Sequence, residues 1–224
     1  IELLLVTTVP SMVISIYGMP PLSLVIYTLA GGTLLAISAN VMNQVLEVET
    51  DKLMERTSDR PIVTGELTKT NGIIYSISSG LIGFLILYFL VTPLSSFIGL
   101  AANIFYVFIY TLILKPRTNQ NIVIGGASGA APVLIGWTAT GSELETGPWV
   151  LFLLVFMWTP AHFWALSIEN KADYKNAEFP MLPIQESYKR TCIFIGIYSC
   201  STVLISLVAA PILQLGIIYL FVSI

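Results

Sequence analysis

Charged residues are scarce in this chain of 224 residues. Asp, Glu, Lys and Arg together make up 10%, whereas 55% of the residues are hydrophobic. A soluble globular domain carries about a quarter charged residues, so the composition excludes an ordinary soluble protein. The mean hydropathy is +0.84, and the apolar runs are long enough to cross a bilayer as helices. The sequence therefore predicts an all-α integral membrane protein embedded in the lipid bilayer, and nothing in it indicates a nucleic-acid partner.

Cysteine and histidine are also rare. The two cysteines, Cys192 and Cys200, fall in one apolar run. We interpret them as buried core thiols rather than as a disulfide or a metal pair. The single histidine, His162, lies within an apolar segment between Trp158 and Trp164. Because polar side chains inside a membrane are costly and often functional, we expect His162 to contact a substrate. The alternative is a histidine hydrogen-bonded to a neighbouring helix.

Long apolar runs dominate what is present. Seven segments and part of an eighth lie near residues 3–18, 21–45, 72–91, 94–113, 121–140, 148–169, 191–209 and 212–224. Proline and glycine mark several of the joins. We therefore expect a multi-helix transmembrane bundle that forms one domain over residues 1–224. The chain starts and stops within apolar sequence, so we expect this domain to be truncated at both ends.

The few basic residues are unevenly placed. Every Lys and Arg lies in the connections after the second, fourth and sixth segments, and the alternate connections carry none. The positive-inside rule puts these three connections on the cytoplasmic side. Two of them are long, on the order of twenty residues, and long loops in compact domains are usually functional. We expect a multi-pass protein of the cell membrane, or of the inner mitochondrial membrane in a eukaryote, with its chemistry on the cytoplasmic face.

The first polar cluster follows the second segment. Asn43, Glu47 and Asp51 are spaced i, i+4 and i+8. If the helix continues this far, the three side chains share one face over roughly 12 Å. Carboxylates suit a hard divalent cation, and the following Arg56 and Arg60 suit phosphate oxygens. The alternative is an acidic helix end that is simply solvated by ordinary i,i+4 pairs.

The second cluster follows the fourth segment. Lys115 and Arg117 stand at a helix end near Asn121, and a run of small residues at 125–131 then enters the fifth segment. The two basic residues are either phosphate ligands or topology anchors. Small residues let helices approach closely in lipid, and they can also leave room for a bulky ligand. Packing is the default interpretation of the glycines.

The third cluster ends the sixth segment. Glu169 and Asp173 form a second i, i+4 acidic pair, followed by Lys175. Two acid pairs that face each other across a helical bundle can hold one or two Mg²⁺ ions and leave open positions for a diphosphate. The repetition of the arrangement favours a metal site over a solvated charged turn.

The three clusters together resemble the UbiA-type membrane prenyltransferases, whose full-length members have about nine membrane helices. The matching stretches are NQVLEVETDKLMERTSDRPIVTG, YTLILKPRTNQNIVIGGASGAAPVLIGW and WTPAHFWALSIENKADYKNAEFPMLP. The second and third stretches are similar to the heme-modifying branch of the family. The family motif Asn-x-x-x-Asp-x-x-x-Asp falls on Asn43, Glu47 and Asp51, with Glu in the middle place. The second family motif is matched by Asp173 and, by spacing alone, by Glu169.

The resemblance implies a Mg²⁺-dependent enzyme, with roles assigned residue by residue. The implied catalytic residues are Asn43, Glu47, Asp51 and Asp173. The implied metal ligands are Glu47, Asp51, Asp173 and Glu169. The implied diphosphate ligands are Arg56, Arg60, Lys115, Arg117 and Asn121. Contacts to the heme or prenyl group would come from His162, Tyr110 and Trp158, and the aromatic faces beside an allylic cation from Tyr106, Tyr110, Trp158 and Phe163.

The implied reaction is transfer of a farnesyl group from farnesyl diphosphate to a vinyl group of heme B, with water added at the same place. The product, heme O, serves respiratory oxidases, and membrane partners of the heme pathway would accompany it. One rival is a family member that prenylates an aromatic quinone precursor. A rival from another class is a membrane transporter, against which the acids at one face and the lack of a clear internal repeat both argue.

Overall fold

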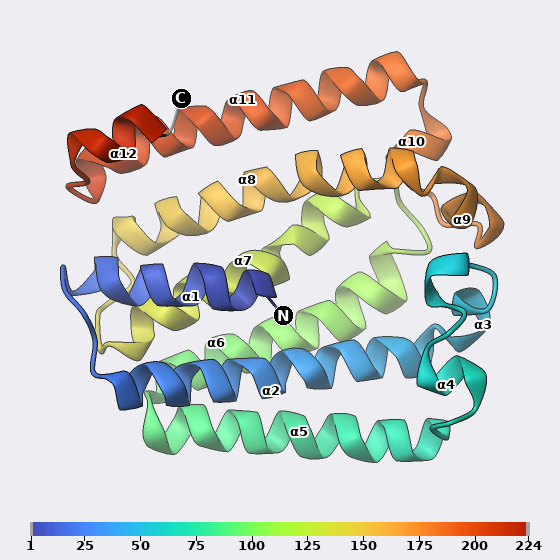
Figure 1. The fold of residues 1–224 in the computed structure, drawn as a ribbon, viewed down its shortest axis with the longest axis horizontal. Coiled ribbons are helices and arrows are strands. Elements are labelled where there is room, and N and C mark those ends of the chain that lie inside the picture. Colours follow the sequence, from blue (N-terminus) through green and yellow to red (C-terminus); the bar gives the residue numbers. More distant parts are fainter. Residues whose placement is uncertain (1, 223–224) are drawn as a thin grey trace.

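The computed structural model describes the backbone of residues 2–222 and the side chains of residues 6–220, and within these limits every regular element is a helix. Figure 1 shows the long helices lying side by side. They are α1 (Glu2–Ser15), α2 (Leu22–Leu46), α5 (Lys69–Leu90), α6 (Pro93–Ile104), which continues as the π-helix η2 (Phe105–Leu114), α7 (Asn121–Ala139), α8 (Thr146–Glu169) and α11 (Tyr188–Ile212).

Among the described residues, six helical stretches are long and apolar enough to cross a membrane: 22–46, 69–90, 93–114, 121–139, 146–169 and 188–212. These confirm the predicted multi-helix membrane bundle. Three of these stretches start with ordinary capping chemistry, since the Thr68, Thr92 and Ser187 side chains each accept a hydrogen bond from a backbone N–H in the first turn. Pro93 follows Thr92 at the first helical position, where no N–H is needed.

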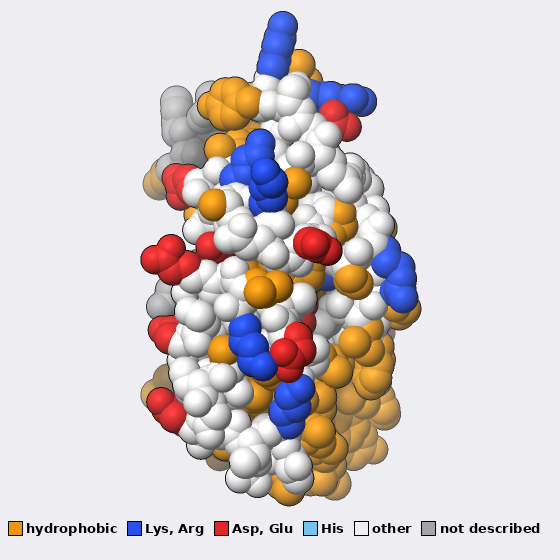
Figure 2. All heavy atoms as spheres, turned by 90° about the vertical axis from the view of Figure 1, so that its right-hand side faces the viewer, with side chains coloured by type: hydrophobic (Ala, Val, Ile, Leu, Met, Phe, Trp, Pro, Cys, Tyr) orange, Lys and Arg blue, Asp and Glu red, His pale blue; other side chains and the backbone are white. Residues whose placement is uncertain are grey.

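The short elements gather at one end of the bundle. Between α2 and α5 lie α3 (Val48–Asp51), η1 (Glu55–Thr57) and α4 (Pro61–Thr64), and between α8 and α11 lie α9 (Lys171–Asn176) and α10 (Leu182–Gln185). The connection from η2 to α7 reaches the same end (Figure 1). Figure 2 looks onto this end, where acidic and basic side chains intermingle over a largely polar surface. The three charged connections therefore share one face, as expected. A last short helix, α12 (Ile217–Val222), follows α11.

Close packing of small residues joins α2 to α5. A methyl group on Gly83 would lie 2.7 Å from the Gly31 carbonyl oxygen. The Ser76 hydroxyl donates to the Ser38 carbonyl across the same interface at 2.8 Å. Such contacts drive helix association in lipid. Lipid tails are as apolar as the helix surfaces, so the hydrophobic effect does not bring the helices together. Helix α7 is the most buried element, and α1, α6 and α8 all pack against it.

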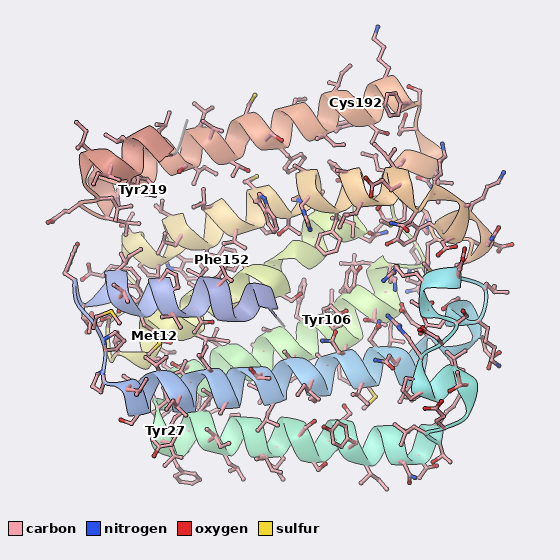
Figure 3. All side chains as sticks on the ribbon, viewed as in Figure 1. Met12, Tyr27, Tyr106, Phe152, Cys192 and Tyr219 are labelled. Carbon is pink, nitrogen blue, oxygen red and sulfur yellow. The ribbon has the colours of Figure 1, made fainter. Side chains whose placement is uncertain are left out.

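One expectation about helix 188–212 was wrong. Cys192 and Cys200 are free thiols, as expected, but both are exposed rather than buried. Figure 3 shows Cys192 on α11, at the outer edge of the bundle. Helix α11 packs mainly against α8, so most of its apolar surface faces outward from the described part of the bundle.

Candidate active site

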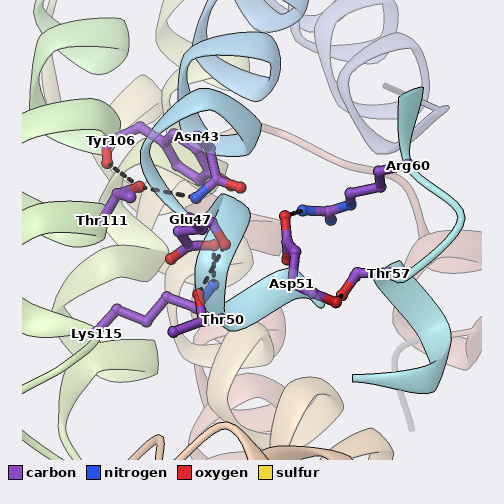
Figure 4. A network of polar contacts seen from close by, with 9 residues as sticks. All are labelled: Asn43, Glu47, Thr50, Asp51, Thr57, Arg60, Tyr106, Thr111 and Lys115. Atoms are coloured by element: carbon purple, nitrogen blue, oxygen red, sulfur yellow. Dashed lines mark hydrogen bonds and ion pairs between the residues drawn. The ribbon is translucent and has the colours of Figure 1, made fainter. Parts of the chain in front are cut away.

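The first polar motif lies where α2 gives way to α3. The backbone bends at Glu47, with φ −102° and ψ 13°, so the expected continuous helix ends at Leu46. Hydrogen bonds from Glu47 N–H to the Asn43 carbonyl and from Asp51 N–H to the Glu47 carbonyl still bridge the bend, at 2.9 and 2.8 Å. Asn43, Glu47 and Asp51 therefore lie one after another along α2 and α3, as Figure 4 shows, and all three are buried.

Asn43 is held by the π-helix. Its side-chain amide donates to the Thr111 hydroxyl at 3.2 Å, and Thr111 donates in turn to the Tyr106 carbonyl at 3.0 Å. That second bond spans five residues, and Lys115 N–H reaches the Tyr110 carbonyl over the same interval. The wider π-helical turn thus aims both Thr111 and Lys115 at α2, and π-helical stretches often mark functional sites.

Glu47 pairs with Lys115. The Lys115 ammonium lies 2.5 Å from Glu47 Oε2, and the two side chains are only 16% and 8% exposed. The same ammonium stands 4.5 Å over the ring of Phe179, which follows α9, so Lys115 links three separate segments. The other carboxylate oxygen, Oε1, is buried without a hydrogen-bond partner among the described residues. A buried orphan oxygen is costly unless something else satisfies it.

Asp51 pairs with Arg60 on the other side. The Arg60 guanidinium donates to Asp51 Oδ2 at 2.6 Å, and the Thr57 hydroxyl donates to the Asp51 backbone carbonyl at 3.0 Å. Figure 4 shows Arg60 and Lys115 approaching from opposite sides. The backbone N–H of Arg56 donates to Asp173 Oδ2 at 3.2 Å. This bond joins the segment after the first acidic motif to the second motif, and its two residues lie 117 residues apart in sequence.

Three other predicted residues stand apart from this cluster. Arg117 is exposed and donates to the Leu112 and Ile113 carbonyls at the end of η2. Asn121 is fully buried, with its amide donating to the Thr118 carbonyl and its own oxygen unpaired among the described residues. Glu169 is exposed at the end of α8. The structure thus brings together Asn43, Glu47, Asp51, Arg60, Lys115, the Arg56 backbone and Asp173.

The carboxylate oxygens of this cluster are the kind of ligand that a hard cation prefers, but their positions in the structure do not form a metal site. No three His, Cys, Asp or Glu side chains within the described part of the chain form a group that could hold a metal ion. Glu47 and Asp51 are instead neutralised by Lys115 and Arg60. The chemistry remains suitable, because Mg²⁺ prefers carboxylate oxygens and Glu47 offers a buried oxygen with no other partner.

An apolar cavity of about 340 Å³ lies inside the bundle between α2, α6, η2, α7 and α8. Its wall is made largely of small and aliphatic residues, with Tyr106 and Phe163 as its aromatic members. Tyr106 lies in the interior of the bundle (Figure 3). Gly129 borders the cavity, and a methyl group there would meet nothing within 4 Å. Gly126 packs against Thr159 instead, so the small-residue run serves both packing and ligand space.

The aromatic residues of α8 border this cavity. The His162 ring stacks on Trp158, with centroids 4.4 Å apart and planes at 16°, and contacts the edge of Phe163. His162 is exposed, and the structure gives it no hydrogen bond to a neighbouring helix among the described residues. Phe163 lines the cavity, which places the His162–Trp158 stack beside it. Tyr110 packs its ring against Gly125 and is not among the cavity-lining residues described.

Sequence reasoning missed several residues of this region. Thr111 orients Asn43, and Phe179 supports Lys115. Asn40, Asn103 and Ser128 supply polar groups to the cavity wall. The two asparagines could have been found, because an amide within an apolar run is unusual. Thr111 and Phe179 carry no such signal, since their partners lie far away in sequence.

These features define a class: an all-helical, multi-pass membrane protein in which a charged cluster at one face adjoins an apolar cavity. The chain belongs to the UbiA prenyltransferase family, whose sequence pattern matches residues 4–224. It is 46% identical over 224 residues to a protoheme IX farnesyltransferase from Cutibacterium acnes, covering 100% of this chain and 66% of that protein. It is 44% identical over 223 residues to one from Streptomyces coelicolor, covering 100% and 71%. The chain thus spans about two thirds of these relatives' length.

Solved structures of the family share the fold. The apo structure of a UbiA homologue from Aeropyrum pernix superposes with a TM-score of 0.82 at 16% identity, covering 99% of this chain and 82% of that one. A UbiA homologue from Archaeoglobus fulgidus bound to DMAPP and Mg²⁺ gives a TM-score of 0.74 at 17% identity, covering 98% and 83%.

Proposed function

We propose that this chain transfers the farnesyl group of farnesyl diphosphate to a vinyl group of heme B, and that water added at the same place gives heme O. The observation that carries the proposal is the match, at 46% identity over the whole chain, to a protein named for that transfer. The geometry agrees with it, because an allylic diphosphate needs a charged site for its head and an apolar one for its tail. Both lie along α2.

The diphosphate would lie against the cluster of Lys115, Arg60 and Arg56. Departure of an allylic diphosphate builds negative charge on the leaving oxygens, and preorganised cations at that place stabilise it. Lys115 and Arg60 are held in place by buried carboxylates, and each has further N–H groups that can donate to an anion. Arg117 and Asn121 are not diphosphate ligands in this proposal, since their side chains donate hydrogen bonds to nearby backbone carbonyls.

Mg²⁺ would be held by Glu47, Asp51 and Asp173, with Glu169 as a weaker candidate because of its exposure. When bound, Mg²⁺ neutralises charge on the diphosphate leaving group. The unpaired Oε1 of Glu47 is the feature that supports this assignment most directly. Asn43, fixed by Thr111, would orient a phosphate oxygen or a metal-bound water.

The prenyl tail would occupy the apolar cavity, and the heme would approach past the His162–Trp158 stack. Flat aromatic faces suit a porphyrin, and Tyr106 and Phe163 offer π faces to the allylic cation. We further propose that the charged end faces the cytoplasm, following the distribution of Lys and Arg. We also propose membrane proteins of the heme pathway as partners.

The deciding experiment is a prenyl-transfer assay in detergent with Mg²⁺ and farnesyl diphosphate. Heme B and 4-hydroxybenzoate are supplied as acceptors in separate reactions. We expect farnesylated product with heme B only. Turnover with 4-hydroxybenzoate alone would replace the proposal with quinone-precursor prenylation. Failure to release diphosphate with any acceptor would favour a transport role instead.

A further inference from the structure

Asn40 presents an uncommitted amide inside the membrane-spanning part of α2. It lines the apolar cavity and is exposed there. Neither its oxygen nor its nitrogen has a hydrogen-bond partner among the described residues, in contrast to the amide of Asn43. An amide that lines an apolar cavity without a protein partner is available to bind a polar group that is not part of the protein.

The other polar groups of the cavity are mostly engaged. The Asn103 amide donates to the Leu35 carbonyl at 2.8 Å, and the Ser128 hydroxyl donates to the Gly125 carbonyl at 2.8 Å. The Tyr106 hydroxyl, like Asn40, has no partner among the described residues. The cavity therefore offers two uncommitted polar side chains, one from α2 and one from η2, in a wall that is otherwise apolar. A buried water molecule needs two to four such partners.

Asn40 lies along α2 at the level where we expect the reacting carbon of the prenyl diphosphate. Asn40 precedes Asn43 by three residues and Glu47 by seven, which is about 4.5 and 10 Å along a helix. The carbon that reacts in a prenyl diphosphate is bonded directly to the diphosphate, so it must lie just inside the membrane from the charged cluster. That level is the stretch of α2 between Asn43 and Asn40.

We propose that Asn40, together with the Tyr106 hydroxyl, holds the water molecule that is added to the prenylated vinyl group. This inference rests on the proposed function and names the residues that determine its product. The amide oxygen accepts one water O–H, and the amide N–H or the tyrosine hydroxyl donates to the water oxygen. The water's second lone pair then faces the acceptor carbon.

The electron and atom balance of the step is as follows. The bond between farnesyl C1 and oxygen breaks, and its electron pair leaves with diphosphate. The vinyl π pair forms the new carbon–carbon bond to C1, which leaves a cation on the vinyl carbon next to the porphyrin. A lone pair of the held water forms the carbon–oxygen bond. The proton of the resulting oxonium goes to the departed diphosphate, the nearest strong base. Without a held water, the cation instead loses a neighbouring C–H proton and becomes an alkene.

The product ratio is therefore the test. Asn40→Leu preserves bulk and removes both polar atoms, so the ratio of alcohol to alkene should fall roughly tenfold, the effect of losing one good hydrogen bond. The alkene is lighter by one water and is resolved by mass spectrometry. Ser201→Ala is the control, because this hydroxyl donates to the Ile197 carbonyl on α11 and does not line the cavity, so the variant should keep the wild-type ratio. Isotopically labelled water should mark the alcohol oxygen in wild type.

A second variant keeps the test possible if Asn40→Leu has no turnover. Tyr106→Phe removes only the hydroxyl and should shift the ratio in the same direction. An unchanged ratio in every variant that turns over would overturn the assignment of the water to Asn40. A wild-type protein that makes no farnesylated heme would overturn the proposed function itself, and this inference with it, so the two failures are distinguishable.

Discussion

Removing the Lys115 ammonium tests how strongly the site depends on its internal ion pairs. Lys115→Met keeps most of the side chain's length and leaves Glu47 charged, 8% exposed and without its cation. Breaking a buried pair by deleting one partner typically costs about 3–5 kcal/mol, because the remaining charge is uncompensated. Loss of the cation–π contact with Phe179 adds to that cost. We therefore expect a marked loss of stability in Lys115→Met.

The measurement is unfolding of purified protein in detergent, by heat and by denaturant. Lys52→Met is the matched control, since Lys52 pairs with the exposed Glu49 and also lowers the pKa of that carboxyl. An exposed pair contributes little, so the control should unfold like wild type. The double variant Lys115→Met/Glu47→Gln removes both charges and should recover most of the lost stability. If Lys115→Met is no less stable than Lys52→Met, the pair does not hold the site together.

Three further predictions concern the proposed chemistry. Asp51→Ala should reduce turnover by on the order of 10²–10³ while the protein still binds heme and unfolds cooperatively, and near-normal rates would remove the motif from the mechanism. Gly129→Phe should fill part of the cavity and block farnesyl transfer, whereas Gly196→Phe, also in open space but on α11, should not; equal rates would place the tail elsewhere. Arg117→Ala loses two hydrogen bonds to η2 carbonyls and should lower stability by about 1 kcal/mol with kcat/KM changed less than about threefold. A tenfold fall in kcat/KM would instead indicate that Arg117 binds the diphosphate.

The helices were largely predictable from sequence because their signals are local. Each long apolar run became a helix, and Thr68, Thr92 and Ser187 began three of them as caps. Burial was not predictable in the same way. In water an apolar run has to find a core, but in lipid it can face outward at no cost, so the apolar pattern around Cys192 and Cys200 does not say whether they are buried or exposed.

The composition of the site was also predictable, but its pairing was not. The i, i+4 spacing of Asn43, Glu47 and Asp51 survives a bend in the backbone because the hydrogen bonds continue across it. The partner of Glu47 depends on the π-helix that turns Lys115 inward, and that distortion leaves no trace in the apolar pattern of 93–114. Sequence spacing cannot tell a basic residue that faces a carboxylate from one, such as Arg117, that ends a helix.

A single face of α2 joins the two halves of the site. Ala36 and Asn40 border the cavity, Asn43 follows them one turn on, and Glu47 comes directly after the last residue of α2 and pairs with Lys115. The residues on this face of α2 thus become more polar toward its C-terminal end, with a change about every turn. A diphosphate ester has the same order of properties along its own length, from apolar tail through the reacting carbon to the charged head. If such an ester binds as we propose, its register against α2 is fixed at both ends, and its reacting carbon lies at the level of Asn40 and Asn43.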